Sequence, residues 1–281
     1  MGEGNTWDYI QPIDVTNVSR AFRSAEGTPH LYIDDFLRPD FAAAVTAAYP
    51  NFEQAEQQGR SYSALHESGK VQITDASLFP DPVRRLNDAL ASDEFLETLV
   101  EITGIEDILA DPVLQGGGMH LMRSGARLDV HVDFNMTKSE KLFRRLNLLL
   151  FLSPTWDAEW GGRFELWDPT VQNRLHAFEP RFNRCVCFAT SETSFHGVEP
   201  VTCPPSELRR TFATYYYTRE PNPDWSGAHH TTLFRHRPGE TSRAILGVPQ
   251  QIKRSFRAAL RTVRQRLRAP TPSKDDQSNN T

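Results

Sequence analysis

Apolar residues in the first part of the chain recur at helical spacing, behind residues that commonly start helices. Three helices are predicted: residues 41–49 after Pro39-Asp40, a helix from Asp81 to Leu90, and a helix from Ser92 onward. Residues 31–37 are predicted as a strand that runs into a helix start. Residues 1–28 are expected to be loosely ordered, and the polar residues 51–75 to form a loop. Residues 29–115 are therefore expected to be mainly helical.

The pattern changes at the glycine run Gly116–Gly118. From there to residue 220, short apolar or alternating segments lie between Gly, Pro, Asn and Asp turns. Strands are predicted at 119–123, 128–134, 147–152, 162–167, 185–189 and 211–217. Many short strands at close spacing indicate a sandwich or a closed barrel rather than an α/β sheet.

Composition adds limits to this picture. With 38% hydrophobic and 24% charged residues, the 281-residue chain has a globular composition and enough length for a full core. No run of about 18 apolar residues is present, so no transmembrane helix is expected. Cys185 and Cys187 are separated by one residue, too few for a disulfide bond that closes a loop, and three cysteines cannot all be paired in disulfide bonds. We therefore expect a reducing environment and a cytoplasmic location.

Charge is distributed unevenly. Residues 241–268 hold eight Lys or Arg and no acidic residue, whereas residues 1–240 hold 22 basic and 34 acidic residues. An acidic body argues against a nucleic-acid partner. Residues 241–268 are expected to form a basic amphipathic helix, followed by a disordered tail at 269–281. That helix would dock on the acidic body or a partner, make a peripheral membrane contact through 250–268, or contact nucleic acid.

His131 and Asp133 are separated by one residue in a predicted strand, so they would share a face. An imidazole and a carboxylate on one face suit a first-row divalent metal, although a surface polar pair is the alternative. His196 stands at the entry to another strand. Two His and one carboxylate would leave three positions open on an octahedral iron. Arg209, further along, is a natural partner for the carboxylate of a second ligand.

Taken together, these motifs resemble the iron(II)/2-oxoglutarate-dependent oxygenases, in particular their prolyl-4-hydroxylase-like branch. The matching residues are His131-x-Asp133, His196-x-Val198 with Pro200-Val201, Arg209-x-Thr211, Gly125, and the segments 31–37, 146–152 and 161–167. The resemblance spans roughly residues 30–235.

The resemblance implies a mainly β fold with flanking helices, a double-stranded β-helix of the jelly-roll, cupin-like type. It implies a dioxygenase domain at 29–240 with its jelly-roll core at 116–220. His131, Asp133 and His196 would hold Fe(II), which 2-oxoglutarate would chelate through its keto-acid end, leaving one position for O2. The distal carboxylate would meet an arginine, and ascorbate is a further implied cofactor.

Some positions leave alternatives open. Arg209 fits the family pattern better than Arg210, and strand alternation sends only one of them into the barrel. Many family members have a Tyr that bonds the distal carboxylate where this chain has Met122, and some have another at Phe151. Asn147 is therefore a candidate second partner for 2-oxoglutarate, with a strand-edge turn role as the alternative.

Other residues are candidates for the substrate pocket. His120 and Met122 are expected to face it, although a hydrogen-bonded core histidine is the alternative for His120. Asn135 would continue the face of Asp133 toward substrate. Residues 136–145 fall where relatives carry a loop that covers the substrate, and their basic residues would recognise an anion unless the loop is merely solvated.

The predicted activity is hydroxylation of an unactivated C–H bond, with release of succinate and CO2. Asp133 favours this over halogenation, because halogenases of this superfamily lack that carboxylate. The substrate would be a small metabolite or a prolyl or other amino-acid residue. The alternatives are a non-catalytic metal-binding jelly-roll module for sensing or binding and, disfavoured by the acidic body, a nucleic-acid demethylase. Oligomeric state is not predicted.

Overall fold

Residues 5–240, which the computed structural model describes, form five α-helices and twelve β-strands. The helices are α1 (Val15–Ser24), α2 (Pro39–Ala47), α3 (Phe52–Gln58), α4 (Asp81–Leu90) and α5 (Asp93–Thr103). The strands are β1 (His30–Ile33), β2 (Arg60–Ser63), β3 (Glu67–Ile73), β4 (Leu109–Ala110), β5 (Gly118–Val132), β6 (Phe143–Phe151), β7 (Phe164–Trp167), β8 (Arg174–Phe178), β9 (Cys185–Ala189), β10 (His196–Val198), β11 (Arg209–Thr218) and β12 (Leu233–Phe234).

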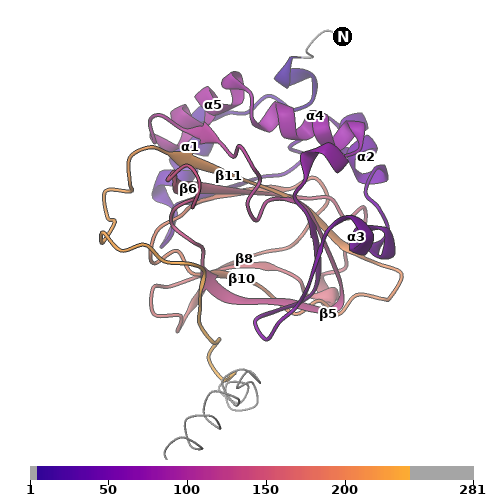
Figure 1. Cartoon of the computed structure of the whole chain (residues 1–281). Coiled ribbons are helices and arrows are strands. Elements are labelled where there is room, and N and C mark those ends of the chain that lie inside the picture. Colours follow the sequence, from indigo (N-terminus) through magenta and orange to yellow (C-terminus); the bar gives the residue numbers. More distant parts are fainter. Residues whose placement is uncertain (1–4, 241–281) are drawn as a thin grey trace, which may run out of the picture. The chain divides into compact units, whose positions relative to one another are not determined.

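The long strand β5 runs through both layers of a single twelve-stranded antiparallel sheet. Its first half pairs with β11 on one side and β3 on the other, and its second half pairs with β10 and β12. The strand path β1-β9-β6-β11-β5-β10-β7-β8 therefore curls into two facing layers (Figure 1). This arrangement confirms the predicted mainly β jelly roll with flanking helices.

Alternation along β6 separates a helix-facing side from an interior side. Leu146, Leu148 and Leu150 are buried in the largest core cluster, together with residues of α4 and α5. In Figure 1 the helices α1, α2, α4 and α5 lie against the layer that contains β6 and β11. Asn147 and Phe151 belong to the opposite side of β6. The helices thus bury one face of the sheet and leave the other face to line the barrel interior.

The first described residues are more ordered than their composition indicated. Residues 5–28 contain α1, which begins after Asp14, whose side chain accepts a hydrogen bond from the Asn17 backbone N–H. Ile10 and Phe22 are buried in the main core. The expected loose terminus is therefore replaced by a capped helix, because a few well-spaced apolar residues find a partner surface on the folded body.

Residues 51–75 also differ from the predicted loop. They contain α3, β2 and β3, and β3 pairs with β5. Val71 and Ile73 are buried on the helix-facing side, while Lys70 and Gln72 line the interior cavity. The strand was not predicted because its inward side is polar, which obscures the usual apolar alternation.

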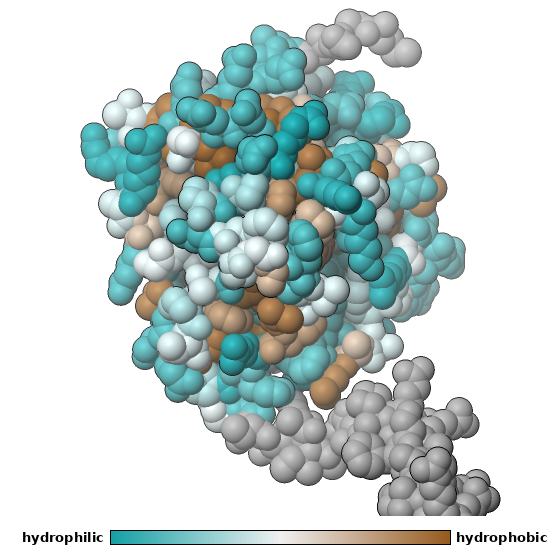
Figure 2. Space-filling view, turned by 60° about the vertical axis from the view of Figure 1, so that its left-hand side comes forward, coloured by the Kyte–Doolittle hydropathy of each residue, from teal (hydrophilic) through white to brown (hydrophobic). Residues whose placement is uncertain are grey.

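The described surface is mainly hydrophilic on the face in Figure 2, where brown hydrophobic areas lie among teal residues. The exposed large hydrophobic residues are Tyr32, Leu65, Leu78, Val113 and Leu233. Among residues 5–240, no helix has the length and apolarity needed to cross a bilayer. The predicted basic helix at 241–268 and the tail at 269–281 lie outside the described residues.

Candidate active site

The two predicted metal-binding histidines lie opposite each other on neighbouring strands. His131 on β5 pairs with His196 on β10 in antiparallel register. Directly opposed residues project to the same face of a sheet, so both imidazoles enter the barrel. Asp133 follows the last residue of β5. The potential ligand atoms of these three side chains all lie within 4.8 Å of one another, which makes them a candidate metal centre.

Backbone carbonyl groups orient both imidazoles. His131 Nδ1 donates to the Asp129 carbonyl at 2.9 Å, and His196 Nδ1 donates to the Ser194 carbonyl at 2.9 Å. Because a carbonyl oxygen only accepts, each Nδ1 carries the proton and each Nε2 keeps its lone pair. The Nε2 atoms lie 3.5 Å (His131) and 3.3 Å (His196) from Asp133 oxygens. Three donor atoms thus converge on one point.

Electrostatics keeps these groups in the protonation states that a metal requires. Burial by itself would raise the pKa of Asp133, but the Arg144 cation and the two histidines outweigh it and hold that pKa well below its ordinary value. Burial, assisted by the neighbouring His131, lowers the pKa of His196 below its ordinary value. A carboxylate and a neutral imidazole are the forms that bind a divalent cation.

A cavity of about 390 Å³ is lined by the side chains of the candidate metal centre and by Arg209 of β11. Arg209 is 3% exposed, and its Nε donates to the Gly162 carbonyl at 2.7 Å while Nη1 donates to Thr211 Oγ1 at 2.9 Å. Its Nη2 is buried and has no hydrogen-bond partner. Burial lowers the pKa of Arg209 to about 9, so the group stays cationic at neutral pH. A buried cationic donor without an acceptor suits an anionic ligand.

Arg210 faces the other way along β11. Its backbone N–H donates to Ser153 Oγ at 2.9 Å, and its charge acts on Tyr49, which is buried in the main core. Arg210 is not among the residues that line the cavity. Of the two registers, the structure therefore directs Arg209 into the barrel, as strand alternation requires of one member of the pair.

Asn147 lies at the metal end of the cavity. Its Nδ2 donates to Asp133 Oδ2 at 2.8 Å, and its Oδ1 accepts from Arg144 Nε at 2.7 Å. The contacts of this side chain are thus with the metal-binding carboxylate rather than with Arg209. Its expected role toward the distal carboxylate of 2-oxoglutarate stays a prediction, and its geometry favours a role beside Asp133.

His120, Met122 and Phe151 lie near Arg209. His120 and Met122 line the cavity, and His120 Nε2 donates to the Gly116 carbonyl at 3.1 Å, so this histidine is hydrogen-bonded within the fold. Met122 Sδ lies 3.8 Å from Arg209 Nη1, and the Phe151 ring lies 5.0 Å from the guanidinium carbon. Met122 and Phe151 thus place sulfur and carbon atoms beside Arg209, at the two positions where the family resemblance implied a tyrosine hydroxyl group.

Asn135 and Lys138 are not among the residues that line the main cavity. Asn135 Nδ2 donates to the Ala228 carbonyl at 2.8 Å, and its Oδ1 accepts from the His230 backbone N–H at 3.2 Å. It therefore tethers the segment that follows β11, and its expected place toward substrate stays a prediction. Lys138 lines a separate surface pocket beside that segment.

Arg144 lies in the site, which differs from its predicted place. The sequence predicts it in a basic loop at 136–145 that covers the substrate, but it is a buried residue of β6 whose Nη2 lies 3.0 Å from Asp133 Oδ2. Strand alternation counted from Asn147 would have selected Arg145 instead. No periodic signal in the chain identifies Arg144 as an inward residue.

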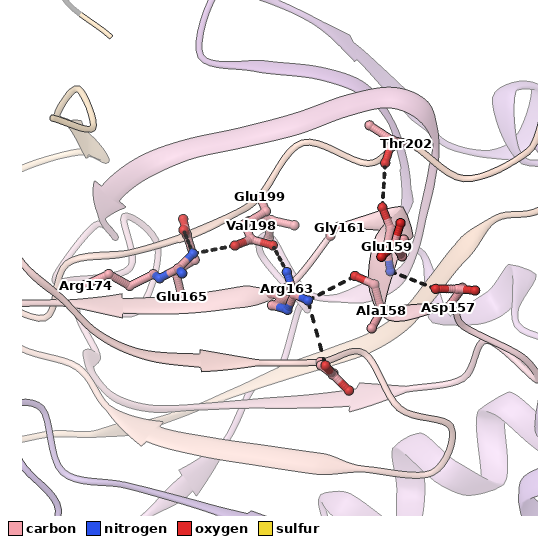
Figure 3. Close-up of polar contacts among 12 residues, drawn as sticks. Asp157, Ala158, Glu159, Gly161, Arg163, Glu165, Arg174, Val198, Glu199 and Thr202 are labelled. Atoms are coloured by element: carbon pink, nitrogen blue, oxygen red, sulfur yellow. Dashed lines mark hydrogen bonds and ion pairs between the residues drawn. The ribbon is translucent and has the colours of Figure 1, made fainter. Parts of the chain in front are cut away.

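An ion-pair network holds together the strands that carry His196. Glu165 of β7 is opposite Gly197 of β10, is 1% exposed, and accepts from Arg174 Nη1 at 3.1 Å. Figure 3 shows Arg174 reaching both Glu165 and Glu199, while Arg163 Nη1 lies 3.2 Å from Glu199 Oε2. These contacts join β7, β8 and the residue after β10, so they stabilise the support of one metal-binding histidine.

Comparison with known proteins agrees with this geometry. Residues 117–218 match the family model described as the 2OG-Fe(II) oxygenase superfamily. A search of curated proteins gave no match.

Among solved structures, a Trichoplax adhaerens prolyl hydroxylase in complex with a hypoxia inducible factor peptide fragment is similar at 16% identity. It has a TM-score of 0.52 and covers 72% of this chain and 88% of that one. A Pseudomonas putida prolyl-4-hydroxylase is similar at 17% identity, with a TM-score of 0.52 and coverage of 72% and 99%. SnoK, a non-heme alpha ketoglutarate dependent carbocyclase from nogalamycin biosynthesis, is similar at 13% identity, with a TM-score of 0.50 and coverage of 89% and 95%.

At these identities the structural likeness establishes the fold, and the family match covers the jelly-roll core at residues 117–218. His131, Asp133 and His196 all fall within the matched residues 117–218, as does Arg209. Residues 117–218, which carry the candidate metal triad, therefore match the 2OG-Fe(II) oxygenase superfamily.

Proposed function

We propose that this oxygenase hydroxylates an unactivated C–H bond of a small metabolite or of a prolyl or other amino-acid residue, with conversion of 2-oxoglutarate to succinate and CO2. The observation that carries the proposal is the buried Arg209, whose Nη2 has no partner and which lines the same cavity as the metal triad. A metal site alone does not require such a cation, whereas a dicarboxylate cosubstrate does.

The donor set fits Fe(II). Two neutral imidazoles and one carboxylate are the ligands of non-heme iron oxygenases, and they leave coordination positions open. His131 and His196 would bind through Nε2, which their Nδ1 hydrogen bonds leave free. When bound, iron and 2-oxoglutarate supply the activation of dioxygen that amino-acid side chains cannot provide.

The chain's own residues would bind, orient and shield these groups. Arg209 would hold the distal carboxylate of 2-oxoglutarate, and its orientation is set in advance by Gly162 and Thr211. Leu149, Phe164 and Phe188 line the same cavity, where apolar side chains exclude water and strengthen charge interactions. Gln72 and Tyr62, which also line it, offer polar contacts to a substrate.

The similar solved structures include enzymes of two kinds, so the proposal includes both substrate classes. The prolyl hydroxylases act on amino-acid residues, whereas SnoK belongs to the biosynthesis of a small molecule. Both have the fold of this chain. We also propose a reducing, cytoplasmic location, which the three buried free cysteines support. Ascorbate is proposed as an additional cofactor on the family resemblance.

The test is anaerobic addition of Fe(II) and then 2-oxoglutarate, followed by the visible charge-transfer band of the chelate. The wild type should form the band, and His131→Ala should lose it. Arg209→Ala should need at least about tenfold more 2-oxoglutarate, while the matched control Arg210→Ala should behave as wild type. A folded wild type that forms no band would refute the proposal and favour a non-catalytic binding module. If the band does form, release of succinate would be used to identify substrates.

A further inference from the structure

Arg144 is a buried cation whose partners surround the metal-binding carboxylate. Its side chain is 2% exposed, Nη2 lies 3.0 Å from Asp133 Oδ2, and Nε donates to Asn147 Oδ1 at 2.7 Å. The guanidinium carbon lies 3.4 Å from the centre of the Tyr215 ring and 4.9 Å from that of Phe134. Directional hydrogen bonds and two aromatic neighbours fix the plane of this group.

A β-bulge turns Arg144 toward the cavity. Counting back from the inward Asn147, regular alternation would place Arg145 inward and Arg144 outward. Between the partners of Tyr216 and Tyr217 on β11, however, β6 advances by two residues instead of one. The inserted residue reverses the alternation, so Arg144 lines the metal cavity and Arg145 lines a separate surface pocket. Bulges next to active sites commonly re-aim a side chain in this way.

The two oxygens of Asp133 are therefore in different environments. Both oxygens lie near a histidine, since Oδ2 is 3.3 Å from His196 Nε2, but only Oδ2 also accepts from Asn147 Nδ2 at 2.8 Å and faces Arg144 Nη2 at 3.0 Å. A carboxylate oxygen has two lone pairs, so these two donors use both of those on Oδ2. Oδ1, which lies 3.5 Å from His131 Nε2, is the oxygen that has lone pairs to offer a metal.

We propose that Arg144 is a positioning residue that, with Asn147, keeps Asp133 a one-oxygen metal ligand. An octahedral centre with two histidines and one such oxygen has three open positions, but only two if both oxygens bind. This inference rests on the proposed function, because 2-oxoglutarate and dioxygen together need three positions. Arg144 thus determines whether the centre has room for both.

The test uses nitric oxide as a spectroscopic substitute for dioxygen, titrated into Fe(II)-loaded protein under nitrogen and followed by electron paramagnetic resonance. Arg144→Met and Asn147→Leu are compared with wild type and with the matched control Arg145→Met. Without 2-oxoglutarate, all four proteins should bind nitric oxide alike, since every centre still has open positions. With saturating 2-oxoglutarate, the affinity of Arg144→Met should fall at least about tenfold, and that of Arg145→Met should match wild type.

A second readout does not depend on 2-oxoglutarate. Crystal structures of the Mn(II)-loaded proteins should show Asp133 bound through Oδ1 alone in wild type and through both oxygens in Arg144→Met. Wild type bound through both oxygens would overturn the inference, as would an Arg144→Met protein that binds nitric oxide beside 2-oxoglutarate as tightly as wild type. A wild type that binds Mn(II) through Oδ1 but binds no 2-oxoglutarate would refute the proposed function and retain the role of Arg144.

Discussion

Arg209 is expected to lower the stability of the ligand-free protein, and its replacement by Met should raise it. Burial lowers the pKa of Arg209 from 12.5 to about 9. At about 1.36 kcal/mol per pH unit, this difference corresponds to a cost of about 5 kcal/mol for holding the cation in the folded state. A hydrogen bond of a charged group returns at least about 1.5 kcal/mol, and Arg209 makes two such bonds, to Gly162 and Thr211, which together offset about 3 kcal/mol. Arg209→Met should therefore increase the free energy of unfolding by up to about 2 kcal/mol.

The sign of the pH dependence follows from linkage. Between pH 9 and 12.5 the unfolded chain retains the Arg209 proton while the folded chain releases it. The free energy of unfolding of the wild type should then rise with pH relative to that of Arg209→Met. The advantage of the variant should be complete near pH 7 and narrow above about pH 9.

The assay is urea unfolding of the chelator-treated protein, with Arg210→Met as the matched control on the opposite face of β11. A thermal scan with Mn(II) and 2-oxoglutarate gives the converse comparison. Relative to the Mn(II)-loaded protein, 2-oxoglutarate at about 100 times the wild-type dissociation constant should stabilise wild type by about 2.7 kcal/mol and Arg209→Met, with an affinity at least about tenfold lower, by at most about 1.4 kcal/mol. A ligand-free Arg209→Met protein that is less stable than both wild type and Arg210→Met would refute the reasoning.

Three further predictions concern the centre and its support. Asp133→Asn should abolish Mn(II) binding and lower the free energy of unfolding by about 3–5 kcal/mol, because it leaves the buried Arg144 unpaired. The double variant Asp133→Asn with Arg144→Met should recover stability without recovering metal binding. Equal stability of the single and the double variant would contradict this. Glu165→Gln should cost about 3–5 kcal/mol in chemical denaturation, since Glu165 is 1% exposed and also lies 2.6 Å from Arg237 Nη2; a loss below about 1 kcal/mol, as for an exposed pair, would argue otherwise. Because burial lowers the pKa of His196 from 6.5, protonation of His196 should weaken Mn(II) binding only below pH 6.5, and a midpoint above that value would exclude this account.

Site residues that depend on local periodicity could be predicted from the chain alone. In a strand, side chains alternate between two faces. His131 and Asp133, two residues apart, therefore share a face, whereas the adjacent Arg209 and Arg210 lie on opposite faces. The placement of His196 opposite His131 required the family resemblance, because pairing between β5 and β10 is a long-range contact that no local pattern specifies.

Residues whose orientation depends on cross-strand pairing were not predictable. Arg144 faces the cavity only because a bulge forms where β6 pairs with β11, and that insertion is defined by the partner strand. Strand β3 was missed because Lys70 and Gln72 face a polar cavity, whose existence depends on how the sheet curls around it.

The sequence by itself indicated the fold class from its short, closely spaced strands, and alternation along one strand put His131 and Asp133 on one face and allowed only one of Arg209 and Arg210 to face the barrel. The family resemblance added His196 and the preference for Arg209. Only the tertiary structure decided what surrounds those groups. It placed Asn147 and Arg144 on one oxygen of Asp133 and left Arg209 Nη2 buried without a partner. The physical reason is that hydrogen bonding and burial depend on which distant strands meet, and neither is encoded in the spacing of residues along the chain.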